Sequence, residues 1–346
     1  INTPVVSFQA GNKDYTIDFN LVNGLNKVSK VNVYKQFTDA KSGSVSSVVL
    51  QGTYDIADAD VVSVIKKLTY ADLKTGEVEF KDLDGNTILQ ENKGGGKTFI
   101  PVEIEGTKGY NIRQVFESPN DEAFYGLGQH QADEFNYKGK NEILFQYNTK
   151  VSIPVIVSNK NYGIFWDNYS VTKFGDPRDY AQLSDLKLFD KDGNEGGLTA
   201  TYMVNGDANN VFVSRIENTI DYENLTTVKK FPADFPFYNS KITWEGEIQS
   251  DDSGVHRFLL YYAGYTKIWI DGQLMAEKWR TAWNPSVAKF GVSMEAGKKY
   301  HIKLEWLPDG GVSYIGLKFL SPVDPSEQNK LSLSSEIGDQ IEYYFI

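Results

Sequence analysis

The sequence has no cysteine, and it has only three histidines and three methionines among its 346 residues. The absence of cysteine excludes disulfide bonds, thiolate zinc sites and cysteine nucleophiles, although it does not identify the cellular compartment. His130, His256 and His301 lack the spacing of a metal site, and His256 and His301 lie in strand patterns that favour outward-facing positions. We therefore predict no metal and no cofactor.

Positive charge is also scarce. Lysine and arginine total 35 against 46 acidic residues, so the formal net charge is −11. Such a surface repels polyanions, which argues against a nucleic-acid partner, whereas neutral sugars are compatible with it. Stretches such as residues 151–157 are the longest mainly apolar ones and are far too short to cross a bilayer, so no membrane span is predicted.

Helical periodicity is nearly absent, and residues 58–67 are the only modest candidate for a helix. Short alternating segments separated by Gly, Asn and Asp fill the chain instead, which is typical of half-buried β-strands. They extend from Val5 to about Tyr222, and a second set follows Pro232 and Pro236, at 241–248, 253–262, 267–270, 300–306 and 313–319. The sequence predicts an all-β protein with a large β-sandwich and a second antiparallel β-sandwich.

The most distinctive stretch is Ala-Phe-Tyr-Gly-Leu-Gly-Gln-His-Gln at residues 123–131. Gly126 and Gly128 permit backbone angles that other residues resist, so the chain can bend sharply there. A Gly-x-Gly also begins a dinucleotide fingerprint, but the third glycine is missing and no helical pattern follows. Spacing alone therefore favours a tight turn between strands.

Three blocks of sequence together carry a family resemblance. Phe-Tyr-Gly-Leu-Gly at 124–128, the segment 147–155 and Asn-Tyr-Gly-Ile-Phe-Trp-Asp-Asn at 161–168 resemble the N-terminal β-domain of glycoside hydrolase family 31. That family contains retaining α-glucosidases and α-xylosidases. The resemblance implies a galactose-mutarotase-like sandwich. The final Tyr-Tyr-Phe-Ile at 343–346 resembles the strand that precedes the catalytic barrel of the family.

A second resemblance covers about residues 237–321. Ser-Gly-x-His-x-Phe at 253–258, Trp-Ile-Asp-Gly at 269–272 and the segment 296–302 resemble the protective-antigen type of β-sandwich, the PA14 domain. Sugar-binding adhesins of this class carry a calcium-binding Asp-Asp pair shortly before the Trp-Ile-Asp-Gly strand. This chain has Ala263-Gly264-Tyr265 there, so calcium-dependent binding of the adhesin kind is not predicted.

The two resemblances suggest an insertion. We expect residues 1–230 to form the N-terminal β-sandwich and residues 231–327 to form an inserted, protective-antigen-like domain for carbohydrate recognition. Residues 328–346 would return as a strand of the first sandwich and lead toward a (β/α)₈ barrel. The two prolines near residue 234 would mark the first junction.

No catalytic residue is assigned. Retaining glycosidases need two carboxyl groups roughly 5 Å apart, and in family 31 both are aspartates on the barrel. Such a barrel takes about 250 residues of alternating strand and helix, and no such pattern occurs in this sequence. The resemblance therefore implies the non-catalytic front part of an enzyme, with the catalytic barrel of the parent protein as its partner.

Two groups of residues are candidates for binding substrate in the first domain. The family sends a loop to the rim of the sugar pocket, and the matching positions are Tyr147, Asn148, Thr149 and Lys150, of which Tyr147, Asn148 and Lys150 are the candidates. Many α-glucosidase relatives have Asp in place of Lys150, which favours a different or larger substrate, although a solvated loop lysine is an equal alternative. Gln129, His130 and Gln131 can donate and accept hydrogen bonds to hydroxyl groups, or can cap the turn.

The inserted domain adds Trp279, Arg280 and Trp283, which lie in a turn-rich connection. An exposed indole ring stacks on the C–H face of a pyranose, and Arg280 can bind hydroxyl groups. The alternative is that one or both tryptophans close the edge of the sandwich. Trp244, Trp269 and Trp306 lie in strand patterns and are predicted to be core residues.

The resemblance implies the N-terminal region of an α-xylosidase that acts on xyloglucan oligosaccharides. An α-glucosidase or α-glucosyltransferase of the same family is the first alternative. A stand-alone carbohydrate-binding or adhesion module, and a purely structural scaffold, are the alternatives from other classes. The opening Ile-Asn-Thr-Pro reads like a trimmed N-terminus, so we expect an exported protein, periplasmic or at the cell surface in a bacterium.

Overall fold

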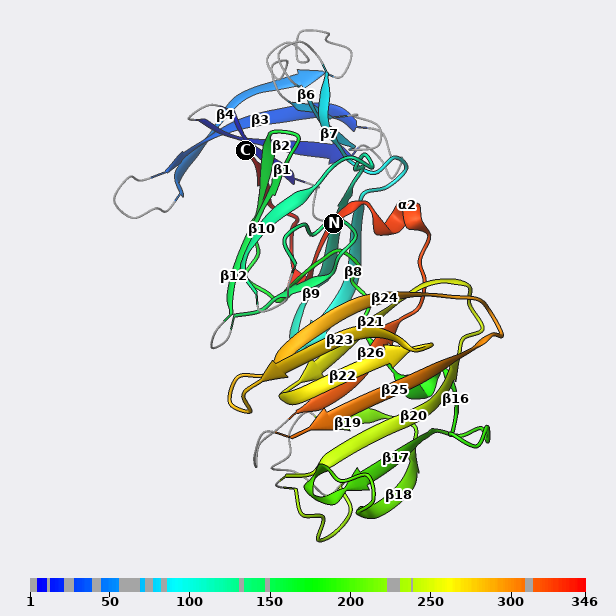
Figure 1. Cartoon of the computed structure of the whole chain (residues 1–346). Helices are drawn as coiled ribbons and strands as arrows, with labels where there is room; N and C mark the ends of the chain where they lie inside the picture. Colours follow the sequence, from blue (N-terminus) through cyan, green and yellow to red (C-terminus); the bar gives the residue numbers. More distant parts are fainter. Residues whose placement is uncertain are drawn as a thin grey trace. The chain divides into compact units, whose positions relative to one another are not determined.

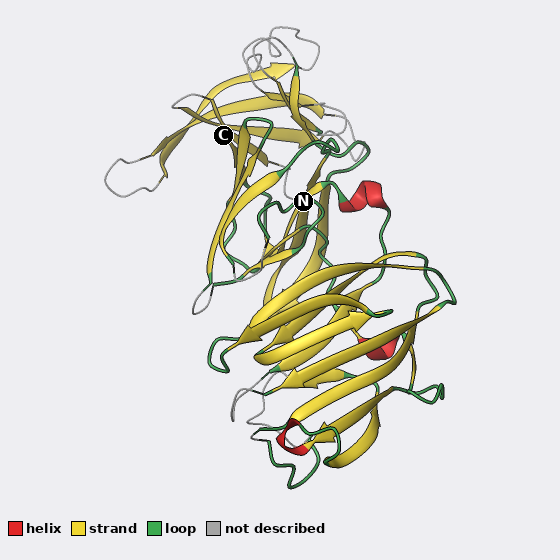
Figure 2. Cartoon of the chain, viewed as in Figure 1, coloured by secondary structure: helices red, strands yellow, loops and turns green. Residues whose placement is uncertain are grey.

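The computed structural model describes residues 5–10, 13–21, 28–38, 45–55, 69–71, 77–81, 86–130, 134–146, 150–222, 231–237, 239–308 and 314–346, with side chains from residue 77 onward. The chain forms two compact units. The first comprises Ile1–His130, Glu134–Pro177 and Pro325–Ile346, and the second comprises Gln131–Asp133 and Arg178–Asp324. Strands dominate both units (Figures 1 and 2), which confirms the all-β prediction.

The described residues of the first unit form four antiparallel sheets. One sheet has the order β1-β2-β3-β4 and another β5-β6-β7; two more have the orders β10-β12-β13-β28 and β11-β14-β27-β9-β8. Their strands are β1 (Val5–Ala10), β2 (Lys13–Leu21), β3 (Val28–Thr38), β4 (Val45–Asp55), β5 (Thr69–Ala71), β6 (Val78–Lys81), β7 (Thr87–Gln90), β8 (Lys97–Ile104), β9 (Thr107–Phe116), β10 (Phe124–Gln129), β11 (Glu142–Leu144), β12 (Val151–Ser158), β13 (Tyr162–Trp166), β14 (Thr172–Phe174), β27 (Leu331–Gly338) and β28 (Tyr343–Phe345). The helix candidate at 58–67 lies outside the described residues.

The C-terminal segment belongs to the first unit. Strand β27 pairs with both β9 and β14, and β28 pairs with β13 through Ile164 and Phe345. Phe116, Phe124, Ile156, Trp166 and Leu333 pack in its core. The chain therefore leaves this core after residue 177 and returns to it after the second unit.

The second unit is a sandwich of two antiparallel sheets. One sheet has the order β15-β26-β21-β24 with β19 beside β26, and the other has the order β18-β17-β20-β25-β22-β23 with β16 beside β20. Its strands are β15 (Ala181–Gln182), β16 (Lys187–Phe189), β17 (Leu198–Met203), β18 (Val211–Glu217), β19 (Ile220–Tyr222), β20 (Lys241–Gln249), β21 (Gly254–Tyr262), β22 (Gly264–Ile270), β23 (Gln273–Arg280), β24 (Ser286–Met294), β25 (Lys299–Leu307) and β26 (Ile315–Leu320).

Helical structure is short throughout the described residues. It consists of two 3₁₀ turns, Leu183–Asp185 and Val204–Gly206, and the helix α2 (Pro325–Gln328). No helix among the described residues combines the length and the apolar character needed to span a membrane.

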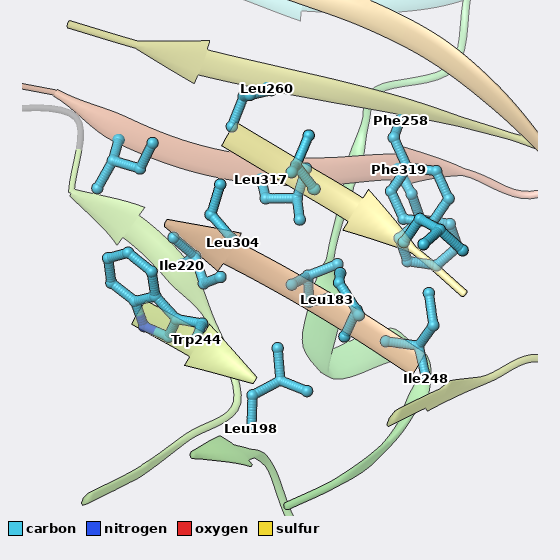
Figure 3. Close-up of a cluster of buried hydrophobic side chains, with 14 of the residues drawn as sticks. Leu183, Leu198, Ile220, Trp244, Ile248, Phe258, Leu260, Leu304, Leu317 and Phe319 are labelled. Carbon is cyan, nitrogen blue, oxygen red and sulfur yellow. The ribbon is translucent and has the colours of Figure 1, made fainter. Parts of the chain in front are cut away.

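Alternation in the strands of the second unit places one side of each in a common core. Trp244 and Ile248 of one sheet face Phe258, Leu260 and Leu317 of the other, and all five are fully buried (Figure 3). Burial of each such side chain stabilises the fold by roughly 1.5–3 kcal/mol.

A buried carboxylate links the two sheets of the second unit. Glu217 accepts hydrogen bonds from Tyr202 Oη at 2.6 Å, from Trp244 Nε1 at 2.7 Å and from Tyr222 Oη at 3.0 Å, and it also pairs with Arg215. Tyr222 belongs to the five-stranded sheet and the other partners to the seven-stranded sheet. Burial, and then the charge of Glu217, raise the pKa of Tyr202 above its usual range.

The expected domain boundary at residue 231 is wrong. Strand β17 pairs with β20 from Thr199 opposite Glu245 to Met203 opposite Lys241, so residues 178–222 belong to the second unit rather than to the first. The segment with the two prolines is no linker, because Phe231, Phe235 and Phe237 pack against the core of the second unit. Proline content signalled irregular backbone correctly, but irregular backbone can also cover a core.

Two further side-chain predictions need correction. His256 is fully buried rather than outward-facing, with Nε2 2.8 Å from Ser250 Oγ. Trp244 and Trp306 are core residues as predicted, but Trp269 is only half-buried, because the alternation in β22 places Ile268 and Ile270 in the core instead.

Candidate functional site

The glycine-rich stretch forms a bulged strand rather than a turn between strands. Gly126, Leu127 and Gly128 of β10 all have positive φ angles, of 107°, 63° and 97°, and the register with β12 shifts between the two glycines. A Cβ atom on Gly126 would lie 2.4 Å from the carbonyl oxygen of Val155, and one on Gly128 would lie 2.1 Å from that of Val151. Glycine is therefore required at both positions by conformation and by space.

The bulge leaves a shallow hollow on the surface of the first unit. Gln129 is exposed at this hollow, and the remaining lining comes from the backbone and from aliphatic side chains: Gly126, Leu127, Gly128, Val151, Ile153 and Val155. The hollow therefore offers mainly van der Waals contact, and the Gln129 amide can donate and accept hydrogen bonds at it.

His130 and Lys150 meet at a buried carboxylate. Lys150 Nζ donates to Glu142 Oε1 at 2.9 Å and to the carbonyl oxygen of Ile143 at 2.5 Å, and this lysine is only 9% exposed. His130 Nε2 lies 2.7 Å from the carbonyl oxygen of Leu127, while Nδ1 lies 3.3 Å from Glu142 Oε1 without forming a hydrogen bond. Both side chains thus fix β10, β11 and β12 together rather than extending into solvent.

The other predicted residues of this group, Gln131, Tyr147 and Asn148, lie outside the described residues. The described residues next to them are held by side-chain contacts. His130, directly before residues 131–133, contacts the carbonyl oxygen of Leu127, and Lys150, directly after residues 147–149, pairs with Glu142. Glu142 was not predicted. A lone glutamate at the start of a short strand gives no sequence signal that it will be buried.

The outer face of the β10-β12-β13-β28 sheet is mainly apolar, with Gln129 opposite Val151 at one end. Every outward position of β12 is aliphatic, and Val151, Ile153 and Val157 are 44–48% exposed. Phe165 of β13 stacks on Tyr344 of β28 on the same face, with ring centroids 5.6 Å apart. Since the inner face of this sheet packs against the core, the sheet is mainly apolar on both sides, which is uncommon for a sheet face exposed to water.

In the second unit, the predicted tryptophans are exposed. Trp279 at the end of β23 is 58% exposed, and Trp283 in the connection to β24 is 73% exposed. Arg280 lies between them in sequence, and its Nε is buried without a hydrogen-bond partner. Two exposed indole rings four residues apart, one at the end of β23 and one in the connection that follows, are unusual on a protein surface and can stack on an apolar ligand face.

A polar cluster adjoins Trp279. Tyr265 lies directly opposite Trp279 in the β22–β23 pairing, and its hydroxyl donates to Glu277, which lies 3.0 Å from Lys267 Nζ. The hydrogen bond from Tyr265, and then that from Lys267, hold the pKa of Glu277 below its usual range. Lys267 also lies over the Tyr265 ring, 5.4 Å from its centroid. Tyr265 and Glu277 were not predicted, although their alternation with buried residues signals an outward face.

Comparison with known protein families accounts for most of the chain. Residues 38–174 match the glycosyl hydrolase 31 N-terminal galactose mutarotase-like domain, and residues 194–319 match the PA14 domain. The chain is therefore a family 31 N-terminal domain that carries a PA14 domain. The PA14 match begins before residue 231, in agreement with the second unit described above.

The individual relatives point the same way. The crystal structure of the family 31 α-xylosidase from Xanthomonas citri covers 99% of this chain with a TM-score of 0.76 and 32% identity. An α-xylosidase of Saccharolobus solfataricus is 38% identical over 107 residues, or 27% of this chain. An uncharacterised family 31 glucosidase of Pseudescherichia vulneris is 31% identical over 87 residues, or 25% of this chain. The chain spans 38% of the length of the first, 15% of the second and 16% of the third.

Proposed function

We propose that this chain is the non-catalytic N-terminal part of a retaining α-xylosidase that releases α-linked xylose from xyloglucan oligosaccharides. The observation that carries the proposal is the likeness to the Xanthomonas citri α-xylosidase, because it extends over both units and 99% of the chain. The role of the chain is to shape the substrate pocket and to bind sugar, while the catalytic aspartates belong to the barrel of the parent enzyme.

In this proposal, the barrel of the parent covers the apolar outer face of the β10-β12-β13-β28 sheet. Three aliphatic side chains of β12 that are each nearly half exposed would otherwise leave an uncovered apolar sheet surface in water. The buried Glu142–Lys150 ion pair supports this arrangement, because it fixes Lys150, the residue that directly follows residues 147–149, and the counterparts of residues 147–150 in the family reach the rim of the pocket.

The second unit supplies recognition of the longer substrate. Trp279 and Trp283 present exposed rings for stacking on pyranose faces, and Arg280 carries donors for hydroxyl groups. In the first unit, Gln129 exposes its amide group at the bulge, where it can bind a hydroxyl group of the sugar. Lys150 is proposed to act through position only, since its ammonium group already has two acceptors.

An α-glucosidase is the second candidate within the same family, favoured by the likeness to the Pseudescherichia vulneris glucosidase. A stand-alone carbohydrate-binding or adhesion module would explain the exposed tryptophans equally well. It would not explain the apolar sheet face of the first unit. The parent enzyme is proposed to be exported, since xyloglucan oligosaccharides arise outside the cell.

The proposal is tested with the chain as it stands. It should not hydrolyse aryl α-xylosides, whereas xyloglucan oligosaccharides should change its tryptophan fluorescence, and Trp283→Ala should remove most of that change. Turnover that copurifies with the chain would contradict the non-catalytic role. An unchanged spectrum at millimolar oligosaccharide would contradict sugar recognition by the second unit. A parent polypeptide close to 38.9 kDa in mass would favour the binding-module alternative.

A further inference from the structure

On the outer face of the seven-stranded sheet of the second unit, side chains of similar chemical character lie in rows across neighbouring strands. Pairing places Trp279, Tyr265 and Leu307 in one row across β23, β22 and β25. The next row along the strands is Glu277, Lys267 and Glu305, and the row beyond it is Leu274, Trp269 and Lys303. Two rows that contain aromatic and aliphatic side chains thus flank one row of charged side chains.

The charges of this face are balanced. The outward positions of β20, β22, β23 and β25 carry four glutamates and four lysines, so that 4 − 4 = 0; these are Glu245, Glu247, Glu277, Glu305, Lys241, Lys267, Lys299 and Lys303. Each lysine lies within 3.1 Å of one of these glutamates. A face without net charge on a chain of charge −11 complements a neutral ligand rather than an ionic one.

The aromatic side chains of the face are held in place. The Tyr265 hydroxyl is bonded to Glu277, and Lys303 Nζ lies 5.8 Å from the centroid of the Trp269 ring. Trp279, Leu274 and Leu307 leave 38–58% of their surface exposed. Side chains that are fixed before binding lose little conformational entropy when a ligand arrives, and paired lysine and glutamate groups offer both donors and acceptors to hydroxyl groups.

We propose that the outer face of β20, β22, β23 and β25 binds the main chain of a β-linked glucan. A neutral chain with flat C–H faces and many hydroxyl groups fits rows of apolar and paired charged side chains. Tyr265 and Trp269 are four residues apart on one strand, or about 13 Å, which is more than one monosaccharide covers. An extended β-linked chain can reach both, whereas α-linked chains curl away from a flat sheet.

The inference rests on the carbohydrate role proposed above, but it assigns the main-chain contact to other residues. The terminal xylose and the connection with Trp283 are not part of this face. Substrate would be held by its unbranched glucan portion on the second unit, independently of the xylose that the parent enzyme removes.

The experiment measures binding of cellohexaose, of a xyloglucan heptasaccharide and of xylose to the intact chain by isothermal titration calorimetry. Trp269→Ala and Tyr265→Ala should weaken cellohexaose binding by about five- to tenfold. Ile216→Ala, at an exposed position opposite Thr199 on the far edge of the same sheet, is the matched control and should leave it unchanged. Glu277→Gln, at an exposed position, should also weaken it and serves if Trp269→Ala does not fold.

The outcomes separate the two proposals. Cellohexaose binding that Trp269→Ala weakens and Trp283→Ala does not affect supports the glucan face. Binding of only the xyloglucan heptasaccharide, lost in Trp283→Ala but not in Trp269→Ala, overturns the glucan face and leaves the proposed function intact. Concentration-dependent self-association that Trp269→Ala abolishes, without any sugar binding, also overturns it and identifies a second copy of the chain as the occupant.

Discussion

The two units present sheets whose outer faces are built in opposite ways. The outward positions of β12 in the first unit are all aliphatic, with Ile153 47% exposed. In the second unit the outward positions of β22 are Tyr265, Lys267 and Trp269, so a charged side chain lies between two aromatic ones, and Lys267 pairs with Glu277 of β23 at 3.0 Å. Both sheets pack a core on their inner side, so the difference lies in what each outer face meets.

An aliphatic face gains free energy only when water is removed from it, and it has no directional groups to select a small polar ligand. A face of paired charges already satisfies its polar groups in water and can exchange those contacts for the hydroxyl groups of a sugar. The two proposals above therefore place protein contact at the aliphatic face of β12 and ligand contact at the outer face of the second unit. The following predictions test the two units separately, from the largest expected effect to the smallest.

The bulge in β10 should be the most sensitive point of the first unit. In Gly128→Val, the new side chain meets the carbonyl oxygen of Val151, and valine must adopt a φ of +97°. We expect a loss of more than about 3 kcal/mol in the free energy of unfolding of this unit, measured by urea titration. Gly106→Val is the control, because Gly106 lies in the same unit and has φ +82° with open space around it, and should cost only about 1–2 kcal/mol. Equal losses would mean that the β12 contact has no role.

The buried carboxylate of Glu217 should be the point of the second unit that is most sensitive to mutation. Glu217→Leu would leave Tyr202, Tyr222 and Trp244 without their acceptor and Arg215 without its partner. We expect this unit to lose about 3 kcal/mol. Calorimetry should show its transition shifted and that of the first unit unchanged. A shift of both transitions would show that the units do not unfold independently.

The sequence predicted where strands occur better than it predicted which strands pair with each other. Alternation predicted strands such as residues 241–248 and 300–306, because one face of each strand must be apolar to join a core. It could not show that β17 joins β20 rather than the first sandwich, since pairing depends on residues distant in sequence. The boundary error at residue 231 arose there, and the two prolines that suggested it lie in a loop whose phenylalanines pack on the core.

The candidate sites show the same limit. Trp279 and Trp283 are both exposed. The turn-rich connection that suggested this contains Trp283, whereas Trp279 lies in strand β23 and is exposed because its side chain points outward from the sheet. The sequence left Lys150 as either a solvated loop lysine or a substrate contact. In the structure its ammonium group instead forms an ion pair with the buried Glu142, eight residues earlier. Burial of one charged residue depends on a partner elsewhere in the fold, so a single sequence gives no sign of it.

A smaller effect is expected from pH, and it should be confined to the second unit. Burial lowers the pKa of His256, whereas unfolding restores the ordinary value near 6.5. The unfolded chain therefore binds more protons below about pH 6.5, so this contribution to stability is complete above that pH and is lost as the pH falls toward the folded pKa. His256→Gln should flatten the decrease in melting temperature of the second unit between about pH 6.5 and 5. An unchanged slope would assign the acid sensitivity to other groups.

The smallest effect on stability should come from the aliphatic face, where the expected change is in surface properties instead. Ile153→Glu should alter the free energy of unfolding by no more than about 0.5 kcal/mol, because the side chain is already 47% exposed. The same substitution should clearly reduce binding of the dye ANS to the folded chain, since it interrupts the apolar row of β12. Leu307→Glu on the second unit is the matched control, at 38% exposure, and should change dye binding little, because its neighbours include paired charges. An equal reduction in both variants would remove the distinction between the two faces. A reduction confined to Ile153→Glu would leave the first unit as the one that requires a protein partner.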